Sequence, residues 1–80
     1  MKSFQEIKQQ QAKELIAVIK YAGSQANLAR ECGVAQQSVH RWVKRGRISK
    51  KGATTIHRVT EGYFRREEMR PDVVLWRYEL

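Results

Sequence analysis

The side chains best suited to chemistry in this 80-residue chain are amides and cations between residues 36 and 45. Helical spacing places five of them on one face: Gln36, Gln37, His40, Arg41 and Lys44. Amides can pair with the edge of adenine through two hydrogen bonds, and guanidinium groups can do the same with guanine. The first four residues are therefore predicted to read bases in the major groove of double-stranded DNA, and Lys44 to contact phosphate.

The excess positive charge of the chain lies next to this face. Sixteen Lys and Arg against eight Asp and Glu give a net charge of +8, and no acidic residue occurs between Cys32 and Thr60. A field of this sign favours polyanions as partners. Further phosphate contacts are predicted for the cations of the loop that should follow the polar face: Arg45, Arg47, Lys50 and Lys51.

Apolar residues recur at three- and four-residue spacing along the chain, which predicts amphipathic helices. Helices are expected at about residues 3–21, from the N-cap Ser24 to a stop at Gly33, and at about 36–45, 53–61 and 64–69. Serine is a common N-cap and glycine a common residue just after a helix. Pro71 should end the last helix.

Residues 24–45 have the organisation of a helix-turn-helix unit. Two helices that cross steeply need a small residue at their contact and a glycine at the turn, and Ala29 and Gly33 meet these needs. The predicted core of the unit is formed by Leu28, Ala29, Gly33, Val34, Val39 and Trp42. Val43 on the third helix, and Ile56 and Val59 on the fourth, are also expected to point inward. The expected fold is an all-α bundle of four to five helices in one domain, 1–80.

The same stretch resembles a known family. The run Gln25, Ala26, Leu28, Ala29, Gly33, Gln36, Gln37, Ser38 is similar to the helix-turn-helix of lambdoid phage repressor and Cro proteins. Residues 23–72, with TIHRVTEG and EEMRPD, resemble more narrowly the Cro-like prophage group described as YdaS antitoxins. The resemblance implies a lambda repressor-like fold, a phosphate contact from Gln25 and base contacts from Gln36 and Gln37. Ala35 departs from the pattern, because those repressors often carry Ser or Thr there as an N-cap.

Nothing in the sequence favours catalysis or a cofactor. Cys32 falls on the apolar side of its helix without a basic partner, and His40 and His57 lack companions at metal-ligand spacing. The five glycines, Gly52 among them, are spread as helix punctuation and do not form a phosphate loop. No catalytic residue, metal or other cofactor is predicted. The single cysteine and the absence of a signal-peptide core or an apolar run of membrane length predict a cytoplasmic protein.

Three non-enzymatic functions are compatible with these patterns. The favoured one is a transcriptional regulator that binds a palindromic operator as a homodimer through the fifth helix and the tail 71–80, which is prone to form a short strand. The second is an antitoxin or other protein-binding module that uses the apolar residues 73–76. The third is binding of RNA or anionic membranes by charge alone. It is disfavoured because Trp42 is expected to face inward and the first helix lacks a basic face with aromatic residues.

Overall fold

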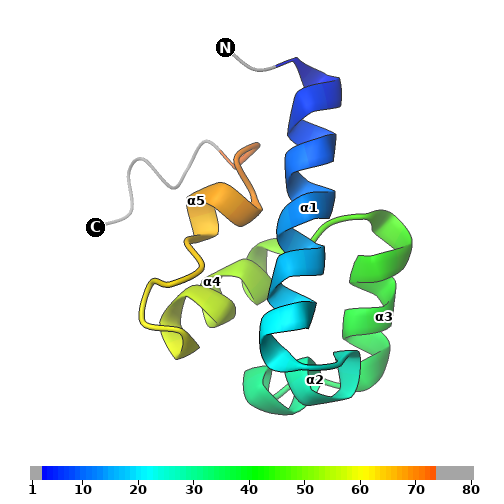
Figure 1. Ribbon diagram of the computed structural model, residues 1–80, viewed down its shortest axis with the longest axis vertical. Helices are drawn as coiled ribbons and strands as arrows, with labels where there is room; N and C mark the ends of the chain where they lie inside the picture. Colours follow the sequence, from blue (N-terminus) through cyan, green and yellow to red (C-terminus); the bar gives the residue numbers. More distant parts are fainter. Residues whose placement is uncertain (1–2, 74–80) are drawn as a thin grey trace.

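The computed structural model describes residues 3–73, which form five α-helices and no strand (Figure 1). The helices are α1 (Phe4–Ala22), α2 (Gln25–Cys32), α3 (Gln36–Arg45), α4 (Lys50–Val59) and α5 (Arg66–Met69). The long α1 contacts α2 near one end and the short α5 further along its length (Figure 1). The prediction of an all-α bundle is confirmed, while the tail strand falls mostly on residues 74–80, outside the described part.

The helix boundaries have local chemical causes. The hydroxyl oxygens of Ser3, Ser24 and Ser49 each accept a hydrogen bond from a backbone N–H three residues further on, at 3.0–3.2 Å. These N-caps supply an acceptor to a group that the helix itself leaves unpaired. Gly33 and Gly46 follow α2 and α3 with φ of +66° and +76°, a left-handed conformation that glycine adopts without strain. The predicted cap Ser24 and the predicted stop Gly33 are thus confirmed.

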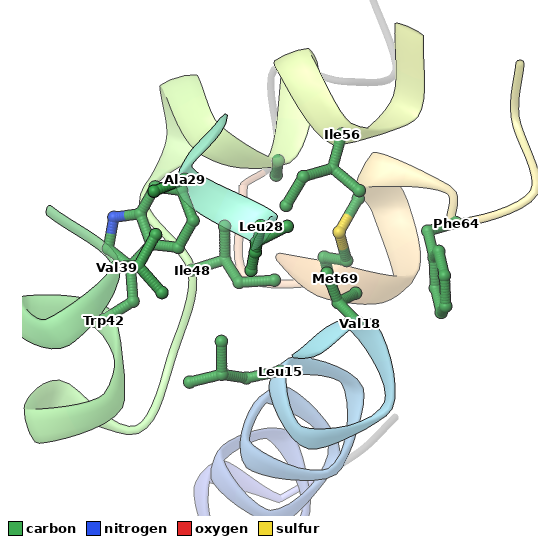
Figure 2. Packing of buried hydrophobic residues seen from close by; sticks show 11 residues of the cluster. Leu15, Val18, Leu28, Ala29, Val39, Trp42, Ile48, Ile56, Phe64 and Met69 are labelled. Atoms are coloured by element: carbon green, nitrogen blue, oxygen red, sulfur yellow. The ribbon is translucent and has the colours of Figure 1, made fainter. Parts of the chain in front are cut away.

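Apolar side chains from all five helices and two connecting segments converge in one core (Figure 2). The core consists of Leu15, Val18, Leu28, Ala29, Val39, Trp42, Ile48, Ala53, Ile56, Phe64 and Met69. Two residues predicted to point inward do not belong to it, because Val43 is 39% exposed and Val59 is 45% exposed. Each lies at the margin of a narrow buried stripe, and no neighbouring helix covers that margin fully.

The fourth helix begins three residues earlier than predicted. Lys50 is its first residue, because the Ser49 hydroxyl accepts a hydrogen bond from the Gly52 N–H at 3.0 Å and caps the helix there. Gly52 therefore lies inside α4, and its interpretation as helix punctuation was wrong. Lys50 and Lys51 belong to the first turn of α4, so their placement in a loop was wrong as well.

Gly52 makes room for the indole ring of Trp42. A Cβ atom on Gly52 would lie 2.5 Å from Trp42 Cζ2, 2.8 Å from Trp42 Cη2 and 3.0 Å from Ile48 Cγ2. Carbon atoms in a packed interior do not approach so closely, and cores hold little empty space into which a ring could move. The missing side chain at position 52 therefore sets how near α3 lies to α4.

Gly52→Ala is expected to lower the free energy of unfolding. An extra methyl group in a filled core costs about 1–3 kcal/mol, and the better helix propensity of alanine offsets up to about 1 kcal/mol of this. Trp42→Phe removes the outer ring atoms that the new Cβ would meet, so the alanine should cost less in that background. Urea unfolding of both single variants, the double variant and the parent gives the coupling energy. An equal cost in both backgrounds would contradict the proposed contact.

Candidate nucleic-acid interface

Helix α3 presents a polar and basic face to solvent. All five residues predicted to contact DNA from this helix are exposed: Gln36, Gln37, His40, Arg41 and Lys44. On the opposite side Val39 and Trp42 are buried in the core. Because a helix cannot turn about its axis once one side is packed, the five polar side chains are held on one outward face. The structure thus gathers these residues as predicted, while base reading itself stays a prediction.

The turn between α2 and α3 fixes the angle between the two helices. The backbone N–H groups of Gly33 and Val34 donate to the carbonyl oxygens of Arg30 and Ala29, at 3.2 and 3.0 Å. A Cβ on Gly33 would meet no atom within 4 Å, so this glycine serves through its left-handed φ and not through close helix contact. Leu28 and Ala29 are buried as predicted, whereas Val34 is only partly buried at the edge of the core.

The two helices of the unit begin differently. The Ser24 hydroxyl accepts from Asn27 N at the start of α2, whose first residue is the half-buried Gln25. Helix α3 starts after Ala35, which makes no side-chain cap hydrogen bond. Alanine has no side-chain acceptor, so the backbone N–H groups in the first turn of α3 lack the cap that Ser or Thr would supply at position 35.

The other predicted phosphate contacts follow one another at the far end of α3. Arg45 is the last residue of that helix, Arg47 lies in the loop to α4, and Lys50 and Lys51 form the first turn of α4. All four are exposed. Lysines in a first turn add to the partial positive charge of a helix amino end, so they raise the local positive potential at some cost in helix stability.

A polar network that the sequence analysis missed holds the loop between α3 and α4. The Arg70 guanidinium donates to the Ile48 carbonyl oxygen at 3.2 Å and to both carboxylate oxygens of Asp72, at 2.9 and 2.8 Å. The Gln11 amide donates to Asp72 Oδ1 at 2.7 Å, and Arg47 Nη1 lies 3.8 Å from Asp72 Oδ2. The network ties this loop to α1 and to the segment after α5.

Two signals in the sequence could have indicated what was missed. Gln11 is only 4% exposed and lies four residues from both Ile7 and Leu15, at a position where the apolar stripe of α1 has a polar residue. A polar residue in such a stripe implies a buried partner. The second signal is on α4, where Thr55 and Arg58 follow Lys51 at four and seven residues, so the three lie along one side of the helix. Arg58 was not among the residues predicted to contact phosphate.

The remaining reactive side chains have structural surroundings. Cys32 is half-buried, and burial together with the neighbouring Glu31 raises the pKa of its thiol, which lowers the share of reactive thiolate near neutral pH. His57 Nδ1 accepts a hydrogen bond from the Arg66 N–H at 3.2 Å, at the start of α5. Within residues 3–73 no three His, Cys, Asp or Glu side chains gather as metal ligands. None of the described helices has the length and apolar character needed to cross a membrane.

The crossing of α2 and α3 about a glycine turn, backed by α1 and α4, defines a helix-turn-helix protein. A model of the family described as "Bacterial toxin YdaS" matches residues 15–78, most of the chain, and the protein belongs to this family. The match confirms the YdaS-like resemblance of residues 23–72, although the description names a toxin where the resemblance had suggested antitoxins. No curated protein and no solved structure matches the chain.

Asp72→Asn is expected to flatten the acid dependence of stability. The hydrogen-bonded Arg70 guanidinium holds the pKa of Asp72 below its ordinary value of 3.8. A carboxylate with a lowered pKa stabilises the fold above its ordinary pKa, and this contribution is lost as the pH falls through the lowered value. In urea unfolding, the stability difference between parent and variant should hold from about pH 7 to 5 and shrink below about pH 4. A difference that stays constant down to about pH 2 would contradict the assignment.

Proposed function

We propose that the protein binds double-stranded DNA sequence-selectively, with α3 in the major groove, and acts in the bacterial cytoplasm as a transcriptional regulator. The observation that carries this proposal is the division of α3 into a packed side, which holds Val39 and Trp42, and an exposed side made only of polar and basic residues apart from the marginal Val43. The major groove admits one α-helix and displays a different donor and acceptor pattern for each base pair.

In this proposal the residues divide into two roles. Gln36, Gln37, His40 and Arg41 read base edges, since amide and guanidinium groups can form paired hydrogen bonds with adenine and guanine. Phosphate is contacted by the residues around them, which contribute affinity without sequence information: Gln25, Lys44, Arg45, Arg47, Lys50 and Lys51. The acid-free stretch from Cys32 to Thr60 supports this division, because no carboxylate of that stretch opposes the approach of DNA.

The proposal includes a homodimer on the operator. One recognition helix covers only a few base pairs, so selectivity normally requires two copies on a palindrome with half-sites about 34 Å apart. The fifth helix and the tail 71–80 remain the proposed contacts between the copies. Most of that tail lies outside the described residues.

Selection of bound sequences from a random DNA pool tests the reading face. The parent should enrich a palindromic consensus, and Gln37→Ala should change the preferred base at one position of each half-site, since the loss of one good base contact removes about 1–3 kcal/mol of discrimination. Gln9→Ala, at an exposed position of α1, is the matched control and should leave the consensus unchanged. Absence of any enriched sequence for the parent would contradict sequence-selective binding.

The family description favours a second candidate, a role in a toxin–antitoxin pair. Here the protein would slow growth or bind a partner protein, with the apolar tail as the proposed contact. Induced expression of the parent and of Gln37→Ala in bacteria separates the two functions. If toxicity follows from DNA binding, growth inhibition by the parent should be relieved in the variant. Equal inhibition by both proteins would assign toxicity to another surface.

A further inference from the structure

An open groove of about 530 Å³ runs between α3 and α4, and the turn between α2 and α3 contributes to its wall. Arg41 and Arg45 of α3 line one side, and Lys51 and Arg58 of α4 line the other. None of the residues that line it is acidic. A cleft lined by charges of one sign concentrates the field and raises the local concentration of counter-ions.

The four cations of this groove are not neutralised within the described part of the chain. The ion pairs there join Arg47, Arg65, Arg66 and Arg70 to Glu67 and Asp72. The cations of the groove take part in none of these pairs, and all four side chains belong to exposed residues. The groove is therefore a concave, uncompensated basic surface, which differs from the paired cations around α5.

The position of the groove beside α3 suits a DNA strand. An α-helix with its side chains is about 10–12 Å wide and the major groove is about 12 Å wide, so the flanks of an inserted helix lie against the phosphate walls. Arg41 and Arg45 mark the flank of α3 that borders α4. Lys51 and Arg58 are seven residues apart, about 10 Å along α4, so they can contact different phosphates of the same strand.

We propose that this groove receives one phosphate strand of the DNA duplex, held between α3 and α4, and that Arg58 is a phosphate contact. This inference rests on the proposed DNA-binding function and adds a second helix to the interface. Arg58 lies in the last turn of α4, about two helical turns beyond Lys51, and so it extends the predicted phosphate contacts to the far end of that helix. Gln36, Gln37 and His40 do not line the groove, so their proposed base-reading role is unaffected.

Arg58→Ala should weaken binding to specific and non-specific duplexes alike. The slope of log affinity against log salt is negative, and the loss of one phosphate contact makes it less steep by about 0.9. This corresponds to about eightfold weaker binding at 0.1 M salt. Arg58→Lys should restore most of the slope, because it keeps the charge. Lys13→Ala is the matched control, since it removes the same charge from an exposed site on α1, outside the groove, and should leave the slope unchanged.

The outcomes separate this inference from the function on which it rests. If the parent binds no duplex, the proposed function fails and the groove assignment fails with it. If the parent binds and Gln37→Ala changes its consensus, but Arg58→Ala and Lys13→Ala have equal slopes, only the groove assignment is overturned. A salt slope unchanged by Arg58→Ala, together with thermal stabilisation of the parent but not of this variant by millimolar inorganic phosphate, would reassign the groove to a small anion.

A purely structural role of Arg58 would give a different result. A cation in the last turn of a helix stabilises it through the helix dipole. Such a role would lower the thermal midpoint of free Arg58→Ala and leave its salt slope equal to that of the parent. We expect the reverse, a less steep slope with a midpoint close to that of Lys13→Ala.

Discussion

The contact between the Trp42 indole and the Cβ-free face of Gly52 determines where α3 lies. Any side chain at position 52 would come within 2.5 Å of the ring, so the observed approach of α3 to α4 requires glycine there. A glycine inside a helix is less favourable than alanine by up to about 1 kcal/mol, and burial of a large aromatic ring offsets this cost. Because Trp42 lies on α3 itself, its burial also decides which side chains of that helix face outward.

Ile48 joins this packing contact to the polar network around Asp72. Its side chain is fully buried and lies beside Gly52, while its carbonyl oxygen accepts a hydrogen bond from Arg70. The loop between α3 and α4 is therefore held by the core on one side and by a charged side chain on the other. A loop held in this way would lose little further conformational freedom if Arg47 met a polyanion, and a small entropy loss favours binding.

The helix-turn-helix could be predicted from sequence because its signals are local. Ser24 and Gly33 act through hydrogen bonds and a backbone angle within a few residues of themselves, and the alternation of buried and exposed positions is visible in the sequence. Gly52 could not be interpreted correctly in this way. A glycine that ends a helix and one that admits a distant indole look alike in sequence, and only tertiary packing distinguishes them. The pairing of Gln11 with Asp72, 61 residues away, was hidden for the same reason.

The carboxylate of Asp72 lies close to one of the predicted phosphate contacts. Asp72 lies 3.8 Å from Arg47 at its closest, and an unpaired carboxylate there would repel DNA. Arg70 binds both oxygens of this carboxylate, so the pair carries no net charge, and the Arg47 side chain stays 48% exposed. The loop is thus anchored by a carboxylate whose charge is already balanced by Arg70. This arrangement stabilises the loop between α3 and α4 without reducing the positive charge that it presents to a polyanion.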